Sequence, residues 1–126
     1  LVISNASFLY LDMPYAMHAD EPGLPWAGYV NTKSIYNFDP LDCWALTAGQ
    51  SSQVLGIQAQ LWSETVFTTE LMDYYTFPRL LAVAERAWNK RPTQDRWPQF
   101  RQALITRELP HISKLGVKYR PDELEE

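Results

Sequence analysis

Two segments of this chain have the pattern of β-strands, and no hairpin turn joins them. The first spans residues 1–12 and the second spans residues 54–64. Residues 13–52 between them are irregular, with a proline, glycine or asparagine every few positions, and form a candidate binding loop. Strands joined by so long a connection are more often parallel than antiparallel. Because a parallel pair needs cover on both faces, two strands alone make no complete sheet, and the pattern indicates a piece of a larger β/α domain.

Each strand-like segment is expected to end with an aromatic ring and a carboxylate on one face. Tyr10 and Asp12 share that face in the first segment, and Trp62 and Glu64 share it in the second. The two members of each pair lie about 7 Å apart along an extended strand. An aromatic ring stacks on the apolar face of a sugar while a carboxylate accepts hydrogen bonds from its hydroxyls. The opposite, aliphatic faces consist of Leu9 and Leu11, and of Leu55, Ile57, Ala59 and Leu61.

Helical patterns occupy much of the remaining chain. A short helix is predicted around Thr32 to Phe38, and a longer one begins after an N-cap at Thr68. Pro78 predicts a break near Phe77. The helix beyond it is expected to pack on a sheet through an apolar stripe of Leu80, Val83, Ala84, Ala87 and Trp88. A last helical stretch follows Arg91-Pro92, with Pro98 in its first turn, and ends at Gly116.

Composition narrows the possible partners. The 126 residues include 11 basic and 15 acidic side chains, so the net charge of −4 argues against nucleic acid as a partner. No window approaches the roughly 18–20 apolar residues of a membrane span. The single cysteine, Cys43, has no neighbours at metal-ligand spacing, and no metal site is expected. Five Trp, seven Tyr and five Phe make the chain rich in aromatic residues, which indicates flat ligands or dense packing.

A series of motifs along the chain resembles the C-terminal part of glycoside hydrolase family 20, the β-N-acetylhexosaminidases, and is most similar to the bacterial chitobiases. The motifs are Phe8-Leu9-Tyr10-Leu11-Asp12, the loop reaching Trp26-Ala27, Ile35-Tyr36-Asn37-Phe38-Asp39-Pro40, Gly56-Ile57-Gln58-Ala59-Gln60-Leu61-Trp62-Ser63-Glu64, and Phe77-Pro78-Arg79-Leu80-Leu81-Ala82-Val83-Ala84-Glu85-Arg86-Ala87-Trp88. Their order along the chain makes the resemblance far more specific than any one motif.

The resemblance implies an α/β fold. Residues 1–126 would be the C-terminal fragment of a (β/α)8 TIM barrel, supplying about its last two β/α units. Asp12 and Glu64 would stand at the C-terminal ends of the seventh and eighth strands, which is the catalytic face of such barrels. The remainder of the barrel would then be a partner of this chain.

The resemblance also implies a reaction and a set of roles. The family removes terminal N-acetyl-β-hexosamine residues with retention, using the substrate's own acetamide oxygen as nucleophile, and needs no cofactor. Tyr10 would be the catalytic residue here, donating a hydrogen bond to that oxygen. Trp26 and Trp62 would wall the acetamide, while Asp12 and Glu64 would bind the 4- and 6-hydroxyls of the sugar. The expected ligand is an oligosaccharide that contains N-acetylglucosamine.

The family's general acid, a Glu preceded by an Asp on an earlier strand, has no counterpart in the chain. Asp20-Glu21 lies in the loop before Pro22-Gly23, so we interpret it as a solvated charge. The chain alone is therefore expected to be inactive. Arg79 and Glu85 are interpreted as an ion pair on the barrel exterior, and His18 as a solvent-facing loop residue.

Two alternatives stay open at this stage. The chain could be a noncatalytic carbohydrate-binding or interaction module, or a structural remnant whose aromatic residues fill a core. The compartment is not indicated by the residues, although the resemblance favours a periplasmic, outer-membrane-associated or secreted protein.

Overall fold

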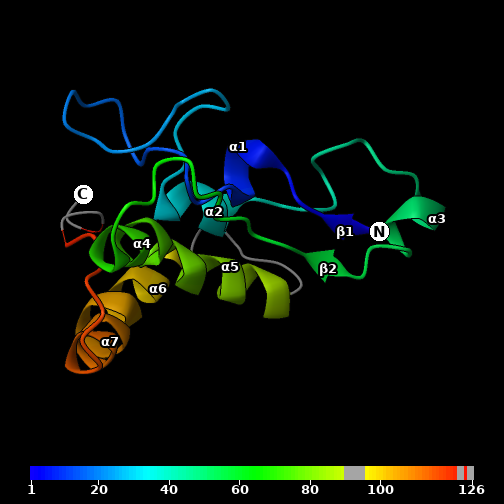
Figure 1. Cartoon of the computed structure of the whole chain (residues 1–126). Helices are drawn as coiled ribbons and strands as arrows, with labels where there is room; N and C mark the ends of the chain where they lie inside the picture. The colour runs from blue at the N-terminus through cyan, green and yellow to red at the C-terminus, as the bar shows by residue number, and fades with distance from the viewer. Residues whose placement is uncertain (90–95, 122–123, 125–126) are drawn as a thin grey trace.

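The computed structural model describes residues 1–89, 96–121 and 124 of the chain. Two short strands, β1 (Val2–Ile3) and β2 (Gly56–Ile57), lie at one end of the molecule, and the last helices of the chain lie toward the other end (Figure 1). The irregular segment after Asp12 arches over the face opposite to the last two helices (Figure 1).

The two strands are parallel, as the connection between them predicts. Val2 pairs with Gly56 and Ile3 with Ile57, and further along Tyr10 forms an isolated parallel bridge with Gln60. Main-chain bonds continue the pairing past the bridge, because the Leu11 N–H donates to the Gln60 carbonyl at 2.7 Å. The two segments therefore run side by side up to the residues that precede Asp12 and Trp62.

The first segment is not the continuous strand that its aliphatic residues predict. It contains a helical turn, α1 (Ala6–Leu9), whose N-cap Asn5 accepts a hydrogen bond from the Ser7 N–H at 3.0 Å. Asparagine and serine side chains compete for main-chain donors in this way and favour a turn over a strand. Tyr10 lies seven positions after Ile3, whereas its partner Gln60 lies only three positions after Ile57. The excess of four positions equals the four residues of α1.

Helix α2 (Thr32–Asn37) confirms the short helix expected there. Its N-cap Asn31 and Ser34 form a reciprocal capping box, which fixes the first turn. A second short helix, α3 (Ala48–Ser51), also begins with a capping box, formed by Thr47 and Gln50. The sequence interpretation did not predict this single turn. Helix α2 packs against the helix that follows Pro78.

The predicted break at Pro78 is confirmed. Helix α4 (Thr69–Thr76) begins after the N-cap Thr68, whose hydroxyl accepts from the Leu71 N–H at 3.1 Å. Helix α5 (Arg79–Trp88) begins directly after the proline. Between them Phe77 caps α4 in an extended conformation, so the chain changes direction where proline removes a helical donor.

The buried face of α5 differs from the predicted apolar stripe. Val83 is buried, but Leu80, Ala84, Ala87 and Trp88 are exposed. The other buried residues of the helix are Arg79, Ala82 and Arg86. The helix packs mainly on α2 rather than on a sheet. Main-chain carbonyls accept from the buried Arg79 guanidinium, and hydropathy does not register such a partner.

The last helical stretch has three parts: α6 (Trp97–Ala103), a π-helical segment η2 (Leu104–Glu108), and α7 (Leu109–Lys114). Pro110 explains the π-helical segment, because it offers no N–H to the carbonyl four residues earlier and its ring crowds that carbonyl. The Leu109 N–H bonds instead to Leu104, five residues back. Gly116, with a φ of 85°, ends the stretch as predicted.

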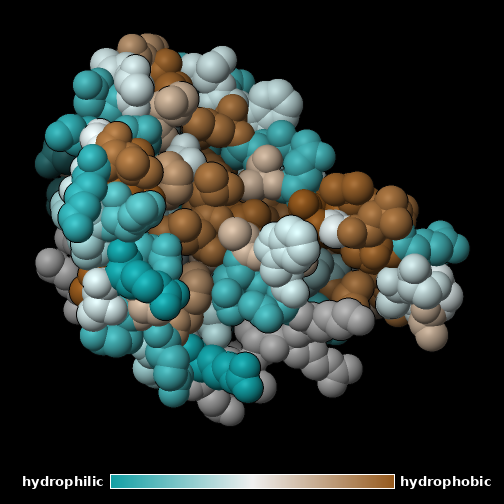
Figure 2. All heavy atoms as spheres, turned by 90° about the horizontal axis from the view of Figure 1, so that it is seen from below, coloured by the Kyte–Doolittle hydropathy of each residue, from teal (hydrophilic) through white to brown (hydrophobic). Residues whose placement is uncertain are grey.

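One apolar core joins these elements. It contains Ile3, Leu9, Leu11, Met13, Val30, Ile35, Tyr36, Phe38, Ala82, Val83, Trp97, Leu104, Leu109 and Leu124. Large apolar side chains also remain on the surface, among them Leu1, Val2, Leu55 and Trp88. Seen from below, apolar atoms form a band across the middle of the molecule that continues toward one end (Figure 2). So much exposed apolar surface is typical of an interaction face.

Candidate functional site

Tyr10 is the centre of an aromatic cluster at the ends of the paired segments. Its ring lies 5.8 Å from the Trp26 ring in an edge-on arrangement and 6.0 Å from the Trp62 ring in a tilted one, measured between ring centroids. Main-chain bonding to Gln60 fixes Tyr10 beside the second segment. The three aromatic residues predicted for the site are thus brought together from three separate stretches of sequence.

Asp12 links the two segment ends through its carboxylate. The side chain is buried, and its Oδ1 accepts a hydrogen bond from the Trp62 N–H at 3.3 Å. A main-chain donor at this distance supplies only weak stabilisation, and the carboxylate keeps further acceptor capacity for a ligand.

A cavity of about 190 Å³ opens beside these residues. Its lining consists of Asp12, Leu24, Trp26, Glu64 and Thr65. Glu64 and Trp26 are exposed, so the cavity is open to solvent. The structure therefore places all five predicted residues in one locality. Tyr10, Trp26 and Trp62 are in ring contact, and Asp12, Trp26 and Glu64 line the cavity.

Leu24 and Thr65 were missed by sequence reasoning. Both are neighbours in sequence of predicted residues, since Thr65 follows Glu64 and Leu24 lies two residues before Trp26. The Thr65 hydroxyl lies 2.9 Å from the hydroxyl of Tyr75, a fully buried residue of α4. Burial raises the pKa of the Tyr75 phenol above its ordinary value.

Arg79 is the most important residue that the sequence interpretation misplaced. It is not part of an exterior pair with Glu85 but is completely buried, while Glu85 accepts a hydrogen bond from Asn89. Its guanidinium donates to the carbonyls of Leu11 and Tyr75, and to those of Met13 and Val30 at 2.8 Å each. Because residues 11 and 13 flank Asp12, this arginine fixes the main chain that carries the site. The sequence places an arginine after Pro78 but does not reveal its acceptors.

Glu21 also differs from its interpretation as a solvated charge. Asp20 is exposed, but the Glu21 side chain is only 5% exposed, and its Oε2 lies 3.2 Å from Nη2 of Arg120. Its Oε1 accepts from the Tyr15 N–H at 3.3 Å and from the Tyr74 hydroxyl at 3.1 Å. The carboxylate is therefore charge-compensated within the fold, whereas His18 is exposed as expected.

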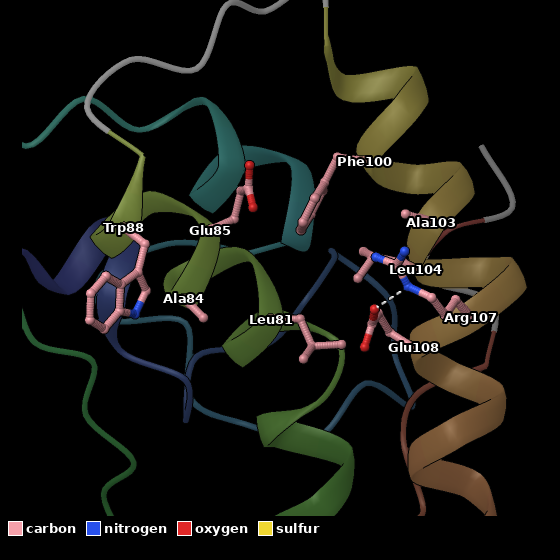
Figure 3. Close-up of a pocket in the computed structure, with 9 residues that line it drawn as sticks. All are labelled: Leu81, Ala84, Glu85, Trp88, Phe100, Ala103, Leu104, Arg107 and Glu108. Carbon is pink, nitrogen blue, oxygen red and sulfur yellow. Dashed lines mark hydrogen bonds and ion pairs between the residues drawn. The ribbon is translucent and has the colours of Figure 1, made fainter.

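A second hollow, of about 370 Å³, lies between α5 and the α6–η2 stretch (Figure 3). Leu81, Ala84 and Trp88 line it from α5, and Phe100 and Leu104 line it from the other side. Its charged edge is the exposed Arg107–Glu108 pair, in which Nε and Oε1 are 2.6 Å apart. Glu85 also lines this hollow. Although it is the larger of the two, its walls are mainly apolar and it holds none of the predicted site residues.

Within residues 1–89, 96–121 and 124, no group of three or more His, Cys, Asp or Glu side chains is placed to hold a metal ion. In the same part of the chain, no helix is long and apolar enough to cross a bilayer. Cys43 is partly buried, its Sγ lies 3.3 Å from the Pro40 carbonyl, and burial raises the pKa of its thiol.

A model of a known protein family matches most of the chain. The model of the catalytic domain of glycosyl hydrolase family 20 matches residues 1–91, which include every predicted site residue. The chain belongs to glycosyl hydrolase family 20. The part of the chain that follows residue 91 lies outside the matched range.

Curated relatives in the family extend the likeness over most of the chain. A beta-hexosaminidase from Vibrio vulnificus is 28% identical over 95% of this chain and 20% of its own length. The N,N'-diacetylchitobiase of Vibrio harveyi is also 28% identical, over 95% of this chain and 18% of its own length. The chain thus spans about a fifth of the length of the curated relatives that it matches.

Solved structures of family 20 enzymes match the fold. The β-N-acetylhexosaminidase of Streptomyces coelicolor A3(2) superposes with a TM-score of 0.85 at 34% identity, covering 98% of this chain and 24% of that one. The exo β-N-acetylglucosaminidase of Vibrio harveyi, solved with N-acetylglucosamine, gives 0.81 at 34% identity, covering 95% and 18%. The chain therefore has the fold of a part of these family 20 enzymes, whose catalytic domain is a TIM barrel.

Proposed function

We propose that this chain supplies part of the substrate pocket of a β-N-acetylhexosaminidase that removes terminal N-acetyl-β-hexosamine from chitobiose or related oligosaccharides. The observation that carries the proposal is the meeting of Tyr10, Trp26 and Trp62 in one ring cluster beside the cavity that Asp12 and Glu64 line. A cluster of rings beside an open cavity that carboxylates line matches the two kinds of surface on an amino-sugar. The names of the family relatives support the same reaction.

We further propose that the two paired segments are the seventh and eighth strands of the barrel and that residues 1–126 form about its last two β/α units. In that arrangement Asp12 and Glu64 stand at the C-terminal ends of their strands, where such barrels bind substrate. The exposed apolar band of Figure 2 would then contact the remainder of the barrel.

The proposed mechanism is substrate-assisted. The acetamide oxygen attacks the anomeric carbon as the bond to the leaving oxygen breaks, and an acid outside this chain protonates that oxygen. Water then attacks the anomeric carbon from the face that the leaving group vacated, its proton returns to the conjugate base of that acid, and the bond to the acetamide oxygen breaks, so the configuration is retained. Tyr10 would donate its phenolic hydrogen to the acetamide oxygen while Trp26 and Trp62 exclude water and restrict the group to the attacking orientation.

Asp12 and Glu64 would contribute binding rather than proton transfer. Asp12 lines the cavity and accepts from the Trp62 main chain through Oδ1, so its second oxygen would be available to accept from a sugar hydroxyl. Glu64 lies at the open side of the same cavity. Together they would hold one end of the ring while the aromatic cluster holds the acetamide.

Replacement of the Tyr10 hydroxyl tests this proposal. In the full-length enzyme, Tyr10→Phe should lower kcat for an aryl N-acetyl-β-glucosaminide by about 10²-fold, the usual effect of removing one donor to a developing charge. KM should change little, since the ring and its contacts remain. Steady-state kinetics with the purified variant provide the measurement.

Tyr36→Phe is the matched control. Tyr36 is a buried tyrosine whose ring contacts Trp97 and Phe100 in the core, so its hydroxyl should not affect turnover. Wild-type kcat in Tyr10→Phe would contradict the proposed role. Saccharide binding by a full-length protein that hydrolyses no N-acetyl-β-hexosaminide would favour a noncatalytic binding module instead.

A further inference from the structure

The loop that carries Trp26 is closed at its base. The Val30 N–H donates to the Pro14 carbonyl at 2.9 Å, so the two ends of residues 14–30 meet. The same Nη1 atom of Arg79 donates to the carbonyls of Met13 and Val30. The base of the loop is therefore fixed to α5, and what remains to be fixed is the part between Tyr15 and Trp26.

Glu21 anchors that middle part from within. Its carboxylate turns inward, where the Tyr15 N–H, the Tyr74 hydroxyl and the Arg120 guanidinium surround it. The Glu21 and Arg120 side chains are only 5% and 13% exposed. A pair so shielded is screened far less by salt and water than a surface pair, and breaking it leaves a buried charge without its partner.

Arg120 reaches Glu21 from a segment that is itself held in place. Its guanidinium lies over the rings of Tyr15, at 4.7 Å, and Tyr74, at 6.0 Å from the ring centroids. The Arg120 N–H donates to the Phe77 carbonyl at 3.1 Å, and the Lys118 N–H donates to Asp73 Oδ2 at 3.0 Å. Residues 117–120 are thus held at the junction of α4 and α5. These four residues lie outside residues 1–91, the range that the family model matches.

Gly23 connects this anchor to the site. It has a φ of 116°, and a Cβ placed there would lie 2.8 Å from the Asp12 carbonyl oxygen and 2.9 Å from the Pro14 nitrogen. The loop therefore returns directly onto the main chain of Asp12 two residues after Glu21. Leu24 and Trp26, which follow at once, line the cavity. Because Trp26 lies only five residues after Glu21, a displacement of Glu21 would also displace Trp26.

We propose that the Glu21–Arg120 ion pair is a positioning element for Trp26, through which residues 117–120 set the shape of the sugar pocket. The proposal rests on the proposed function, because it assigns Trp26 to the pocket wall. Neither Glu21 nor Arg120 touches substrate in this account. Their effect on turnover is transmitted through the loop.

A double-mutant cycle in the full-length enzyme tests the proposal. Trp26→Ala should lower kcat/KM, and Arg120→Met should lower it by about tenfold, within the range that a small misplacement of a binding group costs. In the double variant, Arg120→Met should lower kcat/KM by less than twofold beyond Trp26→Ala alone, because the side chain that the ion pair positions is already absent. Arg120→Lys, which keeps the charge, should recover most of the activity.

Two further variants separate positioning from stability. Arg107→Met removes an arginine from an exposed pair on η2 and should leave kcat/KM unchanged. Glu21→Gln keeps the shape of the side chain and provides the same cycle with Trp26→Ala if Arg120→Met does not fold. The melting temperature of each variant is recorded in parallel. It should stay above the assay temperature, so that unfolding does not account for the loss of kcat/KM.

The possible outcomes distinguish the positioning role from the assignment of Trp26 to the pocket. Unchanged kcat/KM in Arg120→Met and Glu21→Gln, or losses that multiply fully with that of Trp26→Ala, would overturn the positioning role while leaving the pocket assignment intact. Wild-type kinetics in Trp26→Ala would instead overturn the proposed function of Trp26, and with it this inference.

Discussion

Single residues hold the main chain around Asp12 from two sides. Arg79 supplies donors to the carbonyls on either side of it, and its guanidinium also lies 3.7 Å from the centroid of the Tyr15 ring. Burying a guanidinium is costly unless its donors are satisfied, and here carbonyls and an aromatic face do so. Gly23 contacts the same stretch from the loop. The position of the Asp12 carboxylate thus depends on residues that do not themselves line the cavity.

Gly23→Ala should destabilise the protein. The new Cβ would meet the Asp12 main chain, and a φ of 116° is strained for alanine, so the free energy of unfolding should fall by about 1–3 kcal/mol. Turnover should fall too, because the Asp12 backbone must shift. Urea unfolding and steady-state kinetics of the full-length variant measure both effects.

Gly49→Ala is the matched control, since a Cβ there meets open space in α3. Its stability should stay within about 1 kcal/mol of wild type, with unchanged kinetics. Equal stability of the two glycine variants would contradict the close approach at Gly23.

The junction of α4 and α5 connects the site to the core. The Tyr15 hydroxyl shares its one hydrogen between the carbonyls of Tyr74 and Phe77, at 2.9 and 3.0 Å, and Arg79 donates to the carbonyl of Tyr75. These acceptors lie at the C-terminal end of α4 and just beyond it, where helical carbonyls lack intrahelical partners. Long side chains from the loop and from α5 satisfy them, so the end of one helix is completed by the segment that carries the site.

Thr68→Ala should weaken this junction indirectly. Loss of the N-cap hydroxyl leaves the Leu71 N–H without its acceptor and should lower the free energy of unfolding by about 1 kcal/mol. Thr69→Ala, at the exposed first residue of the same helix, should be neutral or slightly stabilising because alanine is a better helix former. Thermal or urea unfolding distinguishes the two, and an equal loss in both would contradict the capping role of Thr68.

For the whole molecule, the sequence predicts features that depend on local chemistry. The parallel pairing, the cap at Thr68 and the break at Pro78 follow from connection length, a hydroxyl at the right position and a missing N–H, and the structure confirms all three. The helical turn α1 was missed because local asparagine and serine bonding overrode an aliphatic, strand-like pattern.

The sequence does not predict features that depend on distant partners. Arg79 and Glu21 look like surface charges because their acceptors and donors come from residues up to 99 positions away, as between Glu21 and Arg120. The grouping of Tyr10, Trp26 and Trp62 could be foreseen in part, since the strand pattern predicts that Tyr10 and Trp62 share a face. Trp26 followed only from the family resemblance, because nothing in the loop's own pattern indicates where it folds.

A crystal structure of the full-length enzyme with N-acetylglucosamine bound tests the central claim most directly. We expect the acetamide to lie between the rings of Trp26 and Trp62 with its oxygen within hydrogen-bond distance of the Tyr10 hydroxyl, and Asp12 and Glu64 to accept from hydroxyls at the far side of the ring. A sugar bound elsewhere in the catalytic domain, or bound without contact to these five side chains, would contradict the account.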